Sequence, residues 1–176
     1  MRIRLTLLRA LRAAKGAALR SAALLALASS SYAETETSSA LVIADAFIEG
    51  GDQSAVNYGD ADKLLCKTAS SDKFTRRPVM KIDVRDFGTA SKILVNLHLL
   101  STNGELTVTA HSSMLNWSES DVTWENSPRL LEKLGSVTVA PGDGGKFISF
   151  DVTSAALKAM EFDGKLGLSF IASGDT

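Results

Sequence analysis

The chain has a single cysteine, Cys66, among its 176 residues, so no disulfide can form within it. A domain without crosslinks has to rely on side-chain packing or on bound ions for its stability. Cys66 stands in the alternating segment KLLCKTA. This pattern favours a small buried apolar side chain over a reactive thiol.

Catalytic signatures are also missing. The sequence contains no HExxH, no paired CxxC, no P-loop and no GxSxG motif. Its two histidines, His98 and His111, do not form a cluster, and its many acidic residues are scattered without a distinct acid/base pair. We therefore predict that the protein is not an enzyme. A lyase with a tyrosine or histidine base is the weakest of the functions considered.

Acidic residues are absent from the first 33 positions. Residues 1–20 carry six basic side chains, and the short apolar run SAALLALA and a small-residue site ending at Ala33 follow. This order predicts a cleaved secretory signal peptide over residues 1–33. The apolar run is too short to span a bilayer. We expect a secreted protein, extracellular or periplasmic, without a membrane anchor after cleavage.

The predicted mature part is acidic. Without the leader the chain retains 13 basic and 20 acidic residues, a net charge of −7. This charge argues against nonspecific binding of nucleic acid, which needs a basic surface. An anionic ligand would require a local basic patch.

Strand patterns dominate the rest of the chain, after a flexible lead-in at residues 34–39. Asn103-Gly104 predicts a hairpin between two of these strands. The segment 153–160 predicts one helix with Thr153 as its N-cap. We predict an all-β fold for residues 40–176, a jelly-roll β-sandwich of about eight strands with one short helix. The predicted strands are 40–48, 63–69, 78–84, 92–100, 105–110, 135–140, 146–152 and 166–172.

Four stretches, in order, resemble a family of secreted bacterial β-sandwich modules, the DNRLRE domain, classified in part as carbohydrate-binding module family 96. They are ADAFI (44–48), NYGDADKLLCK (57–67), RRPVMKIDV (76–84) and WSESDVTWENSP (117–128), with FDVT (150–153) following. The resemblance spans roughly residues 40–174. Phe47 stands where the family often has tyrosine. The family usually continues beyond the final ASGDT into another strand, so we expect a truncated C-terminus.

The resemblance implies a noncatalytic module that binds an acidic polysaccharide such as alginate. It also implies an attached or neighbouring polysaccharide lyase as a partner. The alternative is a structural or adhesive module of a bacterial surface or matrix protein with no sugar ligand. The negative net charge and the lack of a row of aromatic residues favour that alternative.

A uronate polymer carries a carboxylate on each sugar and needs cationic side chains, preferably arginine. Five basic residues lie in the second and third predicted strands: Lys63, Lys67, Arg76, Arg77 and Lys81. Lys63 and Lys67 share one side of their strand, and Arg77 shares the parity of Lys81. If both strands face the same way, four charges converge. The alternative is ordinary solvated positions, which also protect strand edges from aggregation.

The two tryptophans have two interpretations. A ring can stack on a sugar face, or the surrounding polar residues can hold an irregular loop that the rings anchor. We favour the structural role for Trp124 and leave Trp117 as a candidate sugar-binding residue.

Asp45 and Asp151 each lie among apolar strand residues. Carboxylates and turn carbonyls suit a structural calcium ion, so these two residues are candidate calcium ligands. The alternative is that each accepts hydrogen bonds from backbone amides or from a hydroxyl such as that of Thr153.

Overall fold

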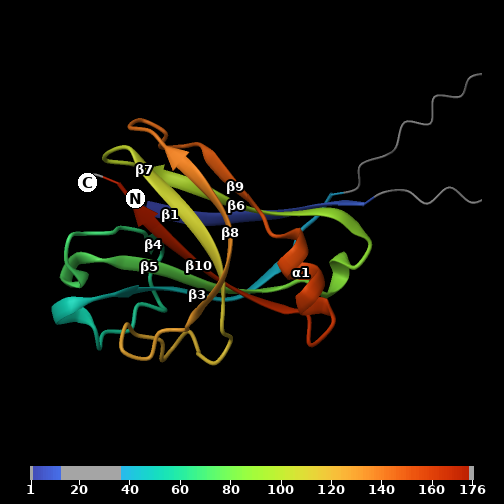
Figure 1. Cartoon of the computed structure of the whole chain (residues 1–176), viewed down its shortest axis with the longest axis horizontal. Coiled ribbons are helices and arrows are strands. Elements are labelled where there is room, and N and C mark those ends of the chain that lie inside the picture. The colour runs from blue at the N-terminus through green and yellow to red at the C-terminus, as the bar shows by residue number, and fades with distance from the viewer. Residues whose placement is uncertain (1, 13–36, 175–176) are drawn as a thin grey trace, which may run out of the picture.

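The strands of the chain form two stacked sheets, shown in a computed structural model that describes residues 2–12 and 37–174 (Figure 1). The first sheet has the order β2-β1-β6-β9, with β4 also paired to β1, and the second has the order β3-β5-β10-β7-β8. All pairs between these strands are antiparallel. The predicted all-β sandwich with one α-helix is confirmed.

The first sheet consists of β1 (Arg2–Arg12), β2 (Thr37–Ser38), β4 (Leu64–Leu65), β6 (Ala90–Ser101) and β9 (Phe147–Asp151). The second consists of β3 (Leu41–Glu49), β5 (Arg76–Asp83), β7 (Leu106–Ser113), β8 (Leu130–Val139) and β10 (Lys165–Ser173). One α-helix, α1 (Thr153–Met160), and three short 3-10 helices complete the described part, the latter at η1 (Gly51–Gln53), η2 (Asp72–Phe74) and η3 (Arg85–Phe87).

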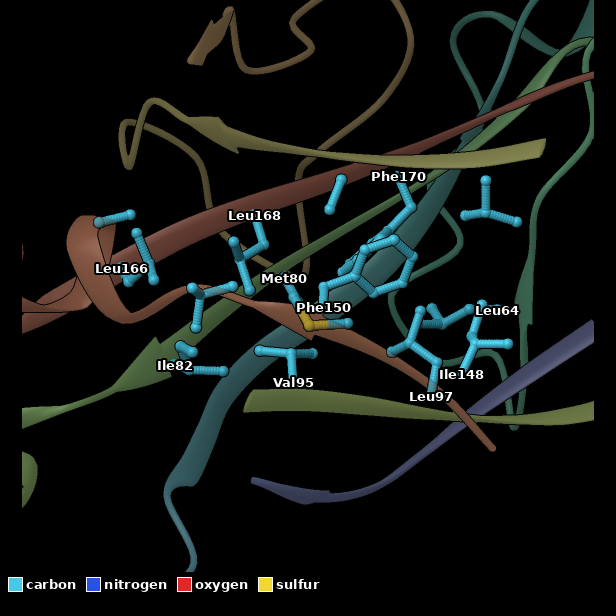
Figure 2. Packing of buried hydrophobic residues seen from close by; sticks show 14 of the residues in the cluster. Leu64, Met80, Ile82, Val95, Leu97, Ile148, Phe150, Leu166, Leu168 and Phe170 are labelled. Atoms are coloured by element: carbon cyan, nitrogen blue, oxygen red, sulfur yellow. The ribbon is translucent and has the colours of Figure 1, made fainter. Parts of the chain in front are cut away.

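The core lies between the two sheets, where alternate residues of the strands point inward. Phe150 of β9 and Phe170 of β10 meet across it with ring centroids 5.5 Å apart (Figure 2). Met80 and Ile82 of β5 are fully buried in the same cluster, as their alternation predicted. Each such side chain contributes about 1.5–3 kcal/mol through its burial.

Cys66 is a buried core residue, as predicted. Its thiol donates to the carbonyl oxygen of Phe170 across 3.6 Å. Burial raises the pKa of this thiol to about 12. Because the thiolate is the reactive form, the side chain is inert at neutral pH.

The hairpin prediction at Asn103-Gly104 is wrong. The strand before this turn, β6, belongs to the first sheet, and the strand after it, β7, belongs to the second. Leu99 before the turn and Leu106 after it are both buried in the shared core. The chain therefore crosses from one layer to the other, because each strand has an apolar face that is buried by facing the opposite sheet.

The helix α1 spans the predicted residues, but Thr153 is its first residue and not its N-cap, which is Val152. At the start of the helix, the side-chain carboxylate of Asp151 accepts hydrogen bonds from the amide and the hydroxyl of Thr153 at 3.0 and 2.6 Å. The Thr153 hydroxyl oxygen also accepts from the amide of Ile93 at 2.8 Å. The FDVT segment thus ties the helix to β6.

The strand β1 falls inside the predicted signal peptide. It pairs with β6 from Arg2 opposite Ser101 to Arg12 opposite Ala90. It is also the strand with which β2 and β4 pair. Cleavage after Ala33 would remove β1 and open one edge of β6. The cleavage site and the lead-in before Thr37 lie outside the described residues, and the signal peptide stays a prediction.

None of the helices within residues 2–12 and 37–174 has the length and apolar character needed to cross a membrane.

Candidate functional site

The strongest candidate site lies on the outer face of the second sheet, the face turned away from the core. On β5, Arg77, Val79 and Lys81 alternate with the buried core residues and so point to this outer face. The outer face extends across the sheet, because Ser169 of β10 lies opposite both Val79 of β5 and His111 of β7. The candidate face therefore runs from β3 to β8.

A loop, residues 114–129, covers the β3 side of the outer face. Its side chains Trp117, Val122 and Trp124 pack against apolar residues of β3 and β5, forming a second, smaller hydrophobic cluster. Trp117 is 9% exposed and Val122 is fully buried. We call this segment the tryptophan loop.

The NYG segment anchors the tryptophan loop. The side-chain amide of Asn57 donates to the carbonyl oxygens of Glu119 and Val122, both at 2.8 Å. Its side-chain oxygen accepts from the amide of Gly59 at 3.1 Å. A Cβ at Gly59 would lie 2.2 Å from the carbonyl oxygen of Glu119, so only glycine fits. Two motifs far apart in the sequence are thus the two sides of one contact.

The polar residues of the loop hold its own backbone. The side-chain oxygen of Asn126 accepts from the amide of Thr123 at 2.7 Å, and its amide donates to the carbonyl oxygen of Asp121 at 2.9 Å. Glu125 accepts from the hydroxyl of Ser54 at 2.9 Å. These bonds agree with the structural interpretation of the segment, in which polar side chains satisfy the irregular backbone.

A basic side chain of β5 lies against each tryptophan ring. The amine of Lys81 lies 4.6 Å from the ring centroid of Trp117 and donates to its carbonyl oxygen. The guanidinium carbon of Arg77 lies 5.5 Å from the ring centroid of Trp124. Burial lowers the pKa of both cations, and repulsion from Lys165 adds to the effect at Lys81. The rings therefore position the charges through cation–π contacts.

The neighbouring Arg76 has a different environment. Its guanidinium forms a 2.7 Å ion pair with Glu49, which lies directly opposite it on β3. Glu49 is 7% exposed, so the pair is largely shielded from water. The charge of Arg76 is therefore compensated within the domain.

The predicted patch residues do not form one group. Arg77 and Lys81 lie together on the outer face of the second sheet. Lys63 precedes the short strand β4 of the first sheet. Lys67 follows it and forms an antiparallel bridge with Arg76 of β5, with backbone hydrogen bonds of 2.9 and 2.7 Å. The amine of Lys67 lies 5.9 Å from the ring centroid of Phe74, and that of Lys63 lies 3.8 Å from a carboxylate oxygen of its neighbour Asp62.

Two residues of the outer face were missed by the sequence interpretation, His111 of β7 and Lys133 of β8. They lie directly opposite each other in the register. The alternation of Thr107 and Thr109 extends to His111 and indicates its face, but no local pattern predicts which strands flank it. The other histidine, His98, is on β6 and contacts the Phe147 ring, with centroids 4.8 Å apart.

The candidate calcium ligands lie on different sheets. Asp151 is on β9 and already binds Thr153, which lowers its pKa. Asp45 is on β3, and its partial burial raises its pKa. Within residues 2–12 and 37–174, no three His, Cys, Asp or Glu side chains are grouped so that they could hold a metal ion.

A comparison with models of known protein families shows to which family the sequence motifs belong. The model of carbohydrate-binding module family 96 matches residues 36–176. The chain belongs to carbohydrate-binding module family 96. The match covers the whole sandwich from β2 onward, so the resemblance noted for the four sequence stretches is confirmed.

Family membership makes this domain a carbohydrate-binding module, a class of noncatalytic domains. The prediction of a carbohydrate partner is confirmed at this level. A search of curated proteins finds no match to the chain.

Proposed function

We propose that this family 96 module is part of an exported protein and binds an acidic polysaccharide such as alginate on the outer face of the second sheet. A polysaccharide lyase, attached or neighbouring, is the proposed partner. The observation that carries the proposal is the pair Arg77 and Lys81. Both are cations on one strand face, and neither has an acidic partner among the described residues.

The two cations can contact different sugars of one polymer chain. They are four residues apart on β5, a separation of about 13 Å along an extended strand. Arginine binds a carboxylate through two parallel hydrogen bonds, whereas lysine acts as a point charge. A linear polymer with a carboxylate on every sugar can satisfy both at once.

Trp117 enters the proposal through its position. Its ring is packed in the smaller cluster and faces the Lys81 amine, which leaves little ring surface for a sugar. We therefore assign to Trp117 the positioning of Lys81. The geometry favours recognition by charge over recognition by stacking.

Affinity electrophoresis of the chain tests this function. The full chain is run through gels that contain alginate, pectin or a neutral glucan, each with and without calcium. We expect retardation by alginate, loss of it in Arg77→Met and Lys81→Met, and no change in Lys146→Met. Lys146 is a matched control because it is exposed and paired with Asp143 in a distant turn.

Two results would contradict the proposal. Retardation by the neutral glucan alone would assign a neutral ligand to the module. Absence of retardation in every gel would favour the alternative of a structural module without a sugar ligand.

A further inference from the structure

A second set of basic groups extends across the outer face beyond the tryptophan loop. His111 lies between Ser169 of β10 and Lys133 of β8 in one cross-strand row. Arg77 points from the same face of β5, two residues from Val79, which stands opposite Ser169. Strand β10 separates β5 from β7, so Arg77 and Lys133 start about 14 Å apart across the sheet, with His111 between them. Both cations are close enough to His111 to lower its pKa.

Two of these groups have unused polar atoms. The Nε of Arg77 and the Nδ1 of His111 are buried and have no hydrogen-bond partner among the described residues. Buried polar atoms are nearly always paired, so a donor and a second nitrogen without partners need an explanation. Ser169 between them forms no hydrogen bond with either group, and its hydroxyl donates to the carbonyl oxygen of Pro78.

The charges on this part of the face are also uncompensated. No carboxylate forms an ion pair with Arg77 or Lys133 within the described part of the chain, whereas Arg76, next along β5, has Glu49. The domain is acidic as a whole, so carboxylates are available elsewhere on its surface. Three basic groups without an acid form a site for an anion.

We propose that Arg77, His111 and Lys133 form a carboxylate-binding subsite that takes one uronate group of the polysaccharide. The proposal rests on the proposed function and adds two residues to it. The carboxylate lies between the guanidinium and the Lys133 amine and accepts a hydrogen bond from His111. Lys81, at the other end of β5, contacts a different sugar.

The site has a consequence for the protonation of His111. Burial, then Lys133 and then Arg77, lower its pKa in the absence of ligand. Ser169, which faces it from β10, does not titrate. A bound carboxylate offsets the effect of Lys133 and Arg77 and raises the pKa of His111, so binding favours the protonated ring. Affinity should therefore increase as the pH falls from 7.5 to 5.5, where the ligand carboxylates, with pKa values near 4, stay ionised.

NMR titration with an alginate trisaccharide tests the subsite directly. The chain has two histidines, so the ring signals of His111 and His98 can be assigned with one variant. We expect the His111 ring signals to shift on binding and their titration midpoint to rise, while those of His98 stay unchanged. An unchanged His111 midpoint in the presence of bound ligand overturns the subsite.

Variants give an independent measurement. A charge-assisted hydrogen bond corresponds to about 10- to 100-fold in affinity, so we expect His111→Ala to weaken binding by at least tenfold at pH 5.5. Lys133→Ala, an exposed charge, should cost up to about fivefold. His98→Ala and Lys146→Ala are the matched controls. His111→Gln keeps a donor, and its pH dependence should vanish even where its affinity is retained.

The results separate the two proposals. If the chain binds alginate and His111→Ala and Lys133→Ala bind like the controls, the subsite is overturned and the proposed function stands. If the unaltered chain binds no acidic glycan, the proposed function fails, and the subsite fails with it.

Discussion

Arg76 and Arg77 are adjacent arginines that should separate folding from binding. Arg76 is paired with the buried Glu49, whereas Arg77 lies against Trp124 and has no acidic partner in the described structure. We consider replacing each by methionine, which keeps most of the apolar stem and removes the charge. Arg76→Met should destabilise the domain, and Arg77→Met should weaken binding.

The cost of Arg76→Met follows from what it leaves behind. The Glu49 side chain is 9% exposed and the Arg76 side chain 29%, so removal of the arginine leaves a buried carboxylate without its partner. Breaking a buried pair in this way costs about 3–5 kcal/mol, and the partial exposure of Arg76 places the value near 3 kcal/mol. For a domain of this size that corresponds to a decrease in Tm of roughly 10 °C.

The cost of Arg77→Met is much smaller. The substitution removes a cation–π contact worth about 0.5–1 kcal/mol, but it also removes a partly desolvated charge. We expect the Tm to change by less than about 3 °C. Polysaccharide binding should decrease strongly in this variant, because the arginine is the proposed carboxylate ligand.

Thermal unfolding and affinity electrophoresis of the same samples provide the assay. Glu49→Gln and the double variant Glu49→Gln/Arg76→Met complete a cycle, in which the double variant should be more stable than Arg76→Met. The reasoning would be refuted by equal loss of stability in Arg76→Met and Arg77→Met. It would also be refuted if Arg76→Met lost binding while its Tm was unchanged.

Three further predictions concern the loop, the N-terminal strand and calcium. Asn57→Ala removes two hydrogen bonds to the tryptophan loop and should lower the free energy of unfolding by about 2 kcal/mol. The tryptophan fluorescence should shift to the red as the loop opens, and unchanged fluorescence would mean that other contacts hold the loop. Deletion of residues 1–33 removes β1, so calorimetry should show a lower Tm and size-exclusion chromatography should show association through the open edge of β6. An equally stable monomer would show that β1 is dispensable. If calcium binds at Asp45 or Asp151, EGTA should lower the Tm of the unaltered chain but not of Asp45→Asn/Asp151→Asn, and equal shifts would place the ion elsewhere.

Period-two alternation allowed much of the fold to be predicted. It indicated the inward Met80 and Ile82 and the outward Lys81, and it indicated that Cys66 is buried. The helix at residues 153–160 was predicted from Thr153 at its start and Gly164 after its end, and its span is confirmed. Each of these properties depends only on residues that are close together in the sequence.

Pairing between distant strands decided the rest. Asn103-Gly104 carries a hairpin signal, yet β6 and β7 belong to different sheets because each buries its apolar side against the opposite layer. Alternation placed Arg77 on the face of Lys81, but it did not show that Arg76 has an acidic partner. Arg76 faces Glu49 on β3, and Arg77 on the other face reaches the tryptophan loop.

The chain by itself therefore determined an all-β module, its buried positions and the motifs of its family, since each depends on short-range pattern. Only the tertiary structure decided which cations are compensated and which share a face, including His111 and Lys133. The physical reason is that the energy of a charge depends on what lies within a few ångströms of it in space. In a sandwich those neighbours come from strands that are tens of residues apart.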